Sequence, residues 1–298
     1  MKTARKHSAK IVEGRNRSEA KYVNQRRGWL TPSVIFGGTV VMLLFCVSVL
    51  ALFYTPYGPL SVSTSHELLG PSLKYLLGTD NYGRDILSRL MAGTSVTFFS
   101  SLGAVAIGGL IGVPAGVFSA LKKGATEEVL MRGMDIIYAF PSLLAAVALV
   151  AAFGASTTTA MVAVGLAFIP VFARVARGSA LSILSQEYVL AARAYGRSGI
   201  KILRRHVIPN IMPIMVVQVF LLLSIGILSI AALSYLGLGT PPPAPTWGSM
   251  LADAQNYLGE DSLMALWPSL CIAISVLGVN VFGDGLREVL DPTLKDAR

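Results

Sequence analysis

The chain has 298 residues, of which 53% are hydrophobic and 14% are charged, whereas about 25% of residues are charged in an average soluble domain. Together with a mean hydropathy of +0.63, these values exclude a disordered chain, a coiled coil and a single water-soluble domain, and they indicate an all-α, polytopic membrane protein. The net charge of +9 is concentrated beside apolar blocks, which is typical of membrane-protein loops, so we expect no nucleic-acid partner.

The N-terminal segment 1–31 is polar and carries nine Lys and Arg residues. We expect it to be a cytoplasmic tail whose basic side chains meet the headgroups of membrane lipid. The block 32–54 contains no Asp, Glu, Lys or Arg, and it is longer than the ~20 helical residues that cross a bilayer. A cleavable secretory signal has a shorter apolar region. We therefore predict a retained first transmembrane helix, followed by an extracytoplasmic loop over 55–94.

Further blocks without charged side chains predict five more transmembrane helices, for a total of six. A small, polar stretch at 154–159 separates two of these blocks and predicts a tight turn. Glycine and proline recur inside the blocks, where they allow close helix packing or bending. We predict a membrane core over 95–285 and a cytoplasmic C-terminal tail over 286–298. The five blocks are 95–121, 136–156, 157–173, 207–235 and 265–283.

The orientation follows from the distribution of basic residues. With the N-terminus in the cytoplasm, the inner segments hold 22 Lys and Arg residues and the outer segments hold three. Cytoplasmic loops of membrane proteins carry such an excess, so we expect both termini in the cytoplasm. The outer segment 236–264 contains a run of prolines before Trp247, and we expect this loop to be stiff and shaped.

The predicted spans contain no Asp, Glu, Lys or Arg, although proton-coupled carriers and intramembrane enzymes usually need one. The sequence also lacks a phosphate-binding loop, a catalytic motif and a metal-ligand spacing. We therefore expect no enzyme, and no metal or cofactor bound by this chain. Three interpretations remain open: a transport subunit driven by a soluble partner, a self-contained channel or secondary carrier, and a membrane enzyme. The missing buried charge argues against the second, and the missing catalytic set against the third.

The inner segment 185–210 predicts a short helix, a glycine turn and a second short helix. In the first helix, the residues at i, i+3, i+4 and i+7 share one face, and Gly196 can take the left-handed conformation that ends a helix. The second helix has Ile200, Leu203 and Val207 on its apolar side, and Pro209 bends the chain into the next span. The shared face of the first helix consists of Tyr188, Ala191, Ala192 and Tyr195.

On this pattern alone, two interpretations of the segment 185–210 stay open. It is either a docking surface for a soluble partner or a basic amphipathic connector that binds anionic headgroups.

The segment resembles the cytoplasmic EAA loop of bacterial ABC importer permeases, although Leu190 stands where the general pattern has glutamate. The departures agree with the peptide and nickel subgroup, which reads E-Y-V-x-A-A-R-A-x-G and then R-H-x-x-P-N. The matching residues here are Glu187, Tyr188, Val189, Ala191, Ala192, Arg193, Ala194, Gly196, Arg205, His206, Pro209 and Asn210.

Similar matches to the subgroup's C-type permease run in order from about residue 77 to residue 292. They include the L-G-T-D-x-x-G-R-D-x-L-S-R pattern at 77–89, the F-P-S run at 140–142 and the L-S-Y-L-G-L-G run at 233–239. The resemblance implies a six-helix importer permease in the bacterial cytoplasmic membrane that moves di- or oligopeptides, with nickel chelates, glutathione or another small solute as alternative cargoes.

The resemblance also implies partners. They are a second, homologous permease that forms a heterodimer with this chain, two cytoplasmic ATPases that use ATP–Mg, and an extracytoplasmic binding protein. The ATPases would dock on the loop 185–210. The implied coupling residues are Glu187, Tyr188, Ala191, Ala192, Arg193, Tyr195, Gly196, His206 and Pro209.

A second group of candidate residues lies in the outer segments: Asp80, Arg84, Asp85, Arg89 and Trp247. One interpretation of the charged residues is an ordinary salt-bridged loop, which stabilises a fold weakly. The other is a shaped extracytoplasmic gate or a receiver for the binding protein.

Overall fold

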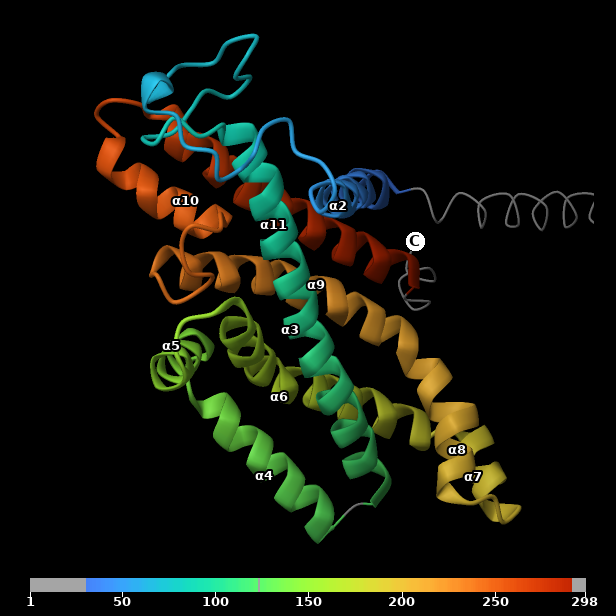
Figure 1. Cartoon of the computed structure of the whole chain (residues 1–298). Coiled ribbons are helices and arrows are strands. Elements are labelled where there is room, and N and C mark those ends of the chain that lie inside the picture. The colour runs from blue at the N-terminus through green and yellow to red at the C-terminus, as the bar shows by residue number, and fades with distance from the viewer. Residues whose placement is uncertain (1–30, 123, 291–298) are drawn as a thin grey trace, which may run out of the picture.

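The computed structural model describes residues 31–122 and 124–290, and these residues are helical with connecting loops (Figure 1). The described part contains no β-strand, only an isolated bridge between Thr79 and Asp85. The all-helical prediction is therefore confirmed. The tail predicted over 1–31, except its last residue, and the last eight residues of the chain lie outside the described residues.

Within residues 31–122 and 124–290, five helices are long and apolar enough to cross a membrane. A sixth span forms if the bent pair α4 and α5 counts as one. The five are α2 (Pro32–Leu50), α3 (Ile86–Lys122), α6 (Thr157–Leu184), the helical run Gly199–Tyr235 that contains α9 (Ile208–Tyr235), and α11 (Leu263–Leu290).

The third predicted span, 136–156, is not one helix. The chain forms α4 (Ala125–Ala139) and α5 (Ser142–Phe153), whose axes differ by 84°. Pro141 has no N–H group to donate, and it disfavours helical geometry in the residue before it; Phe140 is accordingly extended, with ψ of 131°. α5 has 12 residues and spans ~18 Å, so it cannot cross a bilayer alone.

Three other boundaries differ from the sequence prediction because helices continue through charged residues. α3 begins at Ile86, so the loop predicted over 55–94 ends nine residues early; α6 continues to Leu184; and α11 continues to Leu290, into the predicted tail. With 37 residues, α3 is ~55 Å long, whereas the hydrocarbon core is ~30 Å thick. Its ends therefore extend beyond the hydrocarbon, where charged side chains are tolerated.

α3 and α6 pack closely along a stripe of glycines. Gly108, Gly112 and Gly116 recur every four residues and face α6. A Cβ on Gly108 would come within 2.6 Å of the Cβ of Phe168, and one on Gly116 would collide with the carbonyl oxygen of Ala173. Small residues at this spacing allow helix backbones to approach in lipid, and this contact forms the centre of the core.

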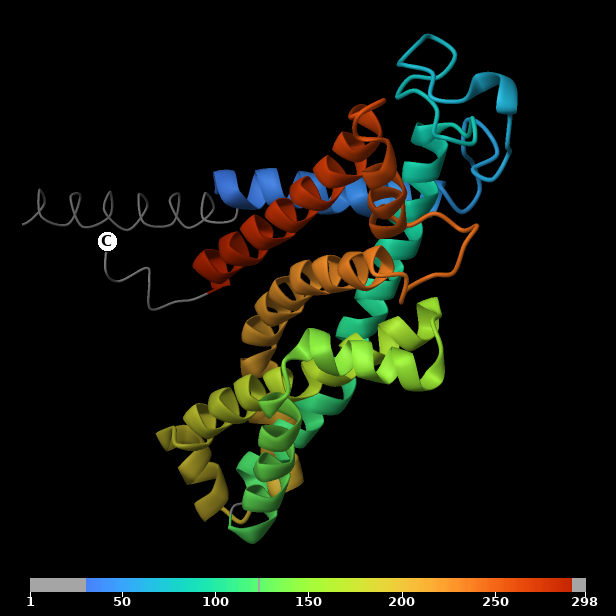
Figure 2. The ribbon, with the colours of Figure 1, turned by 90° about the vertical axis from the view of Figure 1, so that its left-hand side faces the viewer.

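The remaining elements gather at two ends of the molecule. The upper end in Figure 1 carries the loop 51–85, with the turn η1 (Thr64–His66), and also α10 (Trp247–Ala254) and η3 (Gln255–Tyr257). The lower end carries α7 (Glu187–Ala194), α8 (Gly199–Ile202), the π-helical turn η2 (Leu203–Val207) and the start of α4. Figure 2 shows that α3 runs between the two ends, whereas α2 crosses α11 near the upper end.

Candidate functional site

At the lower end, α7 ends at a glycine turn. Gly196 has φ of +76°, the left-handed conformation that the sequence predicts. The N–H of Gly196 donates to the carbonyl of Arg193 at 3.0 Å, and the N–H of Arg197 donates to that of Ala192 at 3.2 Å. These two bonds form a Schellman motif, which satisfies carbonyls left unpaired at a helix end. The turn sends the chain directly from α7 into α8.

Buried aliphatic side chains attach α7 and α8 to the long helices. Val189, Ile202 and Val207 are fully buried, and they form a cluster with residues of α3, α6 and α9. The prediction for the second helix was partly wrong, because Ile200 is 68% exposed and Ile202 takes the buried position. A displacement of α7 would therefore be transmitted to three membrane helices, since packed interiors are not easily compressed.

The predicted coupling face of α7 is exposed. Tyr195 is 89% exposed and Tyr188 is 48% exposed, Ala191 is exposed, and Ala192 is half-buried. The ring of Tyr188 lies 5.7 Å from the ring of His206, so the structure brings these two candidates together. The other candidates, Glu187, Arg193 and Pro209, are exposed. Their role in coupling stays a prediction.

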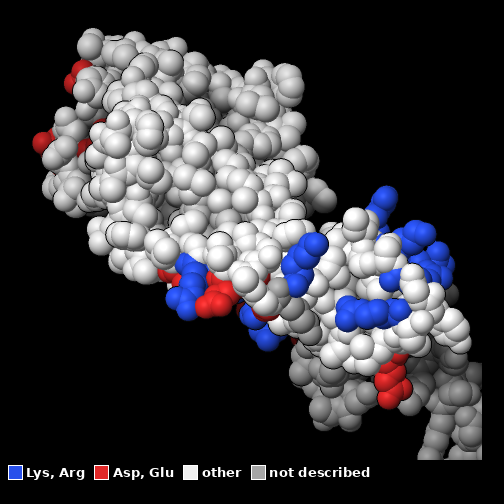
Figure 3. Space-filling view, turned by 90° about the horizontal axis from the view of Figure 1, so that it is seen from below, with Lys and Arg blue, Asp and Glu red and all other residues white. Residues whose placement is uncertain are grey.

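Exposed basic side chains gather on the lower surface of the molecule (Figure 3), where the segment from α7 to η2 contributes Arg193, Arg197, Lys201, Arg204 and Arg205. Two arginines of α6 pair with acidic residues of α4: Arg174 Nη2 lies 2.8 Å from Asp135 Oδ1, and Arg177 Nε lies 2.8 Å from Glu127 Oε1. These pairs fix the lower part of α4 against α6. The sequence analysis missed them, because the paired residues are 39 and 50 positions apart in the chain and no local pattern signals the pairing.

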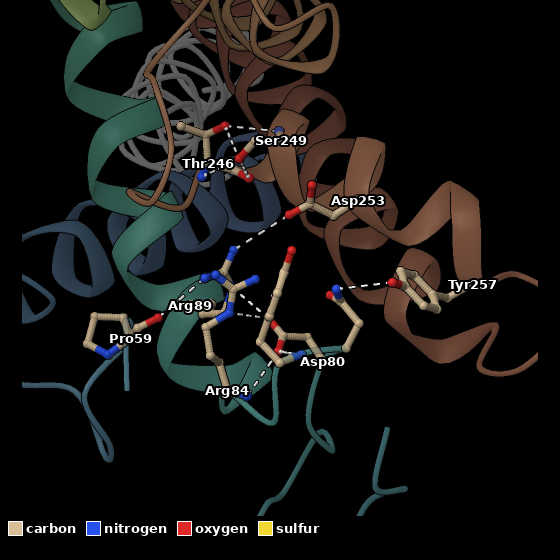
Figure 4. A network of polar contacts seen from close by, with 10 residues as sticks. Pro59, Asp80, Arg84, Arg89, Thr246, Ser249, Asp253 and Tyr257 are labelled. Atoms are coloured by element: carbon tan, nitrogen blue, oxygen red, sulfur yellow. Dashed lines mark hydrogen bonds and ion pairs between the residues drawn. The ribbon is translucent and has the colours of Figure 1, made fainter. Parts of the chain in front are cut away.

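At the upper end, Asp80 is the centre of a buried charge network (Figure 4). Its Oδ1 accepts hydrogen bonds from the N–H groups of Tyr82 and Arg84, both at 2.9 Å. Its Oδ2 lies 2.6 Å from Arg84 Nε and 3.3 Å from Arg89 Nε. Asp80, Arg84 and Arg89 are between 3% and 7% exposed. They are therefore not the exposed, weakly stabilising salt bridges of an ordinary loop.

Arg89 joins the loop to α10. Its Nη1 donates to the carbonyl of Pro59 at 3.4 Å, and its Nη2 lies 3.9 Å from Asp253 Oδ2. Beside this contact, Asn81 Nδ2 donates to the hydroxyl of Tyr257 at 3.3 Å. Burial raises the pKa of the Asp253 carboxyl, and the charge of Arg89 offsets part of this effect. Sequence analysis missed Asp253, which lies far along the chain from Arg89.

The other two upper candidates position α3. Asp85 Oδ2 accepts hydrogen bonds from the N–H of Ser88 at 2.9 Å and from its hydroxyl at 2.6 Å, which caps the first turn of the helix. Trp247 is 1% exposed, and its Nε1 donates to the carbonyl of Leu90 at 3.3 Å. Trp247 therefore packs α10 against α3 rather than facing solvent. A gating or receiving role for the upper residues stays a prediction.

A cavity of about 920 Å³ lies where the chain breaks between α4 and α5. It is bounded by α6, α9 and α11 and lined mainly by apolar side chains, with no charged residue among them. Gln218 and Asn280 contribute amide groups, and Asn280 Oδ1 accepts a hydrogen bond from Ser224 at 2.8 Å. Such amides both donate and accept hydrogen bonds. The cavity therefore suits a solute with neutral polar groups.

Comparison with known proteins agrees with this architecture. Residues 112–296 match the family described as binding-protein-dependent transport system inner membrane component. The chain is 38% identical over 269 residues to the di/tripeptide transport system permease protein DppC of Pseudomonas aeruginosa, and the alignment covers 88% of each chain. It is 37% identical over 262 residues to the glutathione transport system permease protein GsiD of Pectobacterium atrosepticum, which covers 88% of this chain and 87% of that protein.

Among solved structures, a chain of the inward-facing MetNI methionine ABC transporter has a similar fold. The TM-score is 0.56 at 19% identity, and the match covers 67% of this chain and 95% of that chain. The shared part of the fold is therefore almost the whole of the smaller chain.

Proposed function

This chain belongs to the family of binding-protein-dependent transport inner membrane components and is an ABC importer permease, and we propose that it carries di- or oligopeptides into the cell. The relatives named above support a peptide-like cargo, since one is named for di- and tripeptides and another for glutathione. Glutathione, a nickel chelate or another small solute is the alternative.

The observation that carries the proposed mechanism is the exposed face of α7 on a helix whose buried side packs against three membrane helices. In this proposal, one of the two cytoplasmic ATPases docks on Tyr188, Ala191 and Tyr195, and closure of the ATPases around ATP–Mg displaces α7. The displacement passes through Val189 and Ile202 to α3, α6 and α9. The lower end is then cytoplasmic, together with both termini.

A second, homologous permease completes the path in this proposal, and an extracytoplasmic binding protein delivers cargo at the upper end. The cavity at the α4–α5 break forms this chain's half of the path. Its amides, Gln218 and Asn280, match the alternating donors and acceptors of a peptide backbone. The absence of charge in the lining allows peptides of different side chains to pass.

Uptake in cells tests the cargo. The complete transporter is expressed in a strain without other peptide importers, and uptake of a labelled dipeptide is measured with and without excess glutathione or nickel chelate. We expect dipeptide uptake that unlabelled dipeptide suppresses. Uptake of glutathione or nickel chelate, with no uptake of the dipeptide, would overturn the peptide assignment.

The path is tested by Gln218→Leu, which removes one amide from the cavity. We expect slower peptide uptake at normal membrane levels. Ser229→Ala is the matched control on the same helix, because Ser229 does not line the cavity and its hydroxyl donates only to the carbonyl of Ile225 in its own helix. Equal uptake by both variants would place the path elsewhere.

A further inference from the structure

A second hollow, separate from the cavity at the α4–α5 break, lies at the lower end. It is a groove of about 930 Å³ between α3, α4 and the start of α9. Its lining is apolar except for Thr126, and includes Phe118 of α3, Val129 of α4 and Met212 of α9. These three side chains are 44%, 70% and 47% exposed. An apolar groove this open is unfavourable in water, so it requires an apolar occupant.

Three basic residues lie next to residues that line this groove. Lys122 Nζ lies 6.0 Å from the ring centroid of Phe118. Arg204 and Arg205 follow Leu203, which lines the groove and belongs to the turn before α9. A Cβ added to Gly199, the first residue of α8, would lie 3.4 Å from the side chain of Leu121. The start of α8 therefore lies beside the end of α3.

The nearest acidic residues of α4 do not neutralise these three basic residues. Glu127 pairs with Arg177 of α6, and Glu128 pairs with Arg132 on α4 itself. Among the ion pairs of the described residues, none involves Lys122, Arg204 or Arg205. The groove therefore combines an apolar trough with adjoining basic residues.

We propose that the groove binds an anionic phospholipid, with its acyl chains along α3, α4 and α9 and its phosphate at Lys122, Arg204 and Arg205. An amphiphile satisfies both parts of the site at once. A transmembrane helix from a partner subunit would fill the apolar trough but would leave three cations without a counter-charge. Anionic headgroups attract basic residues near a membrane surface, by the equivalent of about fivefold in binding for each residue.

The site adjoins α7, and it shares Leu203, Arg204 and Arg205 with the loop 185–210 that carries the proposed ATPase docking surface. Leu203 and Ile211 line the groove, and both also belong to the buried cluster that anchors α7 and α8. A bound lipid would therefore stiffen the junction through which α7 acts on the membrane helices. This proposal does not depend on which solute the chain carries.

Photocrosslinking tests the proposal on the complete transporter, with its partner subunits, in phosphatidylcholine vesicles. The vesicles contain a trace of either phosphatidylglycerol or phosphatidylcholine with a photoactivatable group on the acyl chain, and adducts are mapped by mass spectrometry. We expect adducts on 113–118, 125–130 and 208–212. Phosphatidylglycerol should exceed phosphatidylcholine there by at least about fivefold.

Two variants sharpen the test. The triple variant Lys122→Gln, Arg204→Gln, Arg205→Gln should bring the ratio of the two lipids close to one. Lys74→Gln changes an exposed basic residue of the upper loop that does not line the groove, and it should leave the ratio unchanged. Val129→Trp should fill the groove and lower adducts from both lipids. Equal labelling by the two lipids in the wild type would overturn the proposal. So would crosslinks from the groove to a partner subunit in place of lipid.

Discussion

Gly196→Val tests whether the turn after α7 is needed for coupling. Gly196 has φ of +76°, and an added Cβ would meet no heavy atom within 4 Å. The cost of the substitution is therefore backbone strain alone, about 1–2 kcal/mol for a residue with a Cβ in this conformation. If the ATPase binds only the observed turn, this strain reduces the population that is competent to bind, and the apparent affinity for the ATPase should fall about 5- to 30-fold.

Purified variants in lipid nanodiscs are titrated with the partner ATPase, and uptake is measured in the same cells. Gly196→Asn should restore most of the affinity, because asparagine tolerates the left-handed conformation. Gly154→Val is the matched control: Gly154 has φ of +90° with equally open space, but it lies in the turn between α5 and α6. If Gly196→Val binds ATPase like the wild type, or Gly154→Val loses the same affinity, the turn after α7 has no specific role in docking.

Five further predictions rest on the structure and the sequence. Ala192→Glu should insert normally but lose ATPase co-purification and uptake, because it places an unpaired charge in the docking face; unchanged co-purification would exclude that face. Asp80→Asn should lower the free energy of unfolding by about 3–5 kcal/mol, because it leaves the buried arginines without their central carboxylate. Asp253→Asn should change the free energy of unfolding little, and denaturant titration measures both values. The pKa of Asp253 is raised in the folded state, so the folded state holds this proton more tightly than the unfolded state. The free energy of unfolding of the wild type, compared with that of Asp253→Asn, should therefore fall as the pH rises through this pKa and be recovered at lower pH. A difference between the two proteins that does not change with pH would contradict this prediction. On a background without native cysteines, an impermeant thiol reagent should label a cysteine at position 157 in intact cells but not one replacing Arg193, and the reverse pattern would invert the topology. The purified chain alone should neither bind nor hydrolyse ATP, since it has no phosphate-binding loop, and turnover by the pure chain would contradict the assignment of ATP hydrolysis to partners.

Local chemistry determined the class of this protein and the turn after α7. A run of uncharged apolar residues long enough to cross a bilayer is helical because its backbone groups must be paired within the segment, so six spans could be predicted from hydropathy. Gly196 could be predicted as the end of a helix because a left-handed residue after a short amphipathic stretch is a local preference. The structure confirms five of the six spans as single helices and the left-handed conformation of Gly196, whereas the third predicted span is the bent pair α4 and α5.

Tertiary contacts decided the rest. Helical periodicity placed Ile200 on the apolar side of the second loop helix, but in the structure Ile200 is exposed and Ile202 packs with residues of α3 and α6. Pro141 was visible in the sequence, yet whether it bends a span or breaks it depends on the neighbours that replace the lost backbone bond. Asp80 and Arg89 looked like loop charges, and only their burial against α10, with Asp253 arriving from a distant segment, makes them a structural network. Burial of charge is favourable only when its partners are already in place, and those partners are brought together by the fold and not by adjacency in the chain.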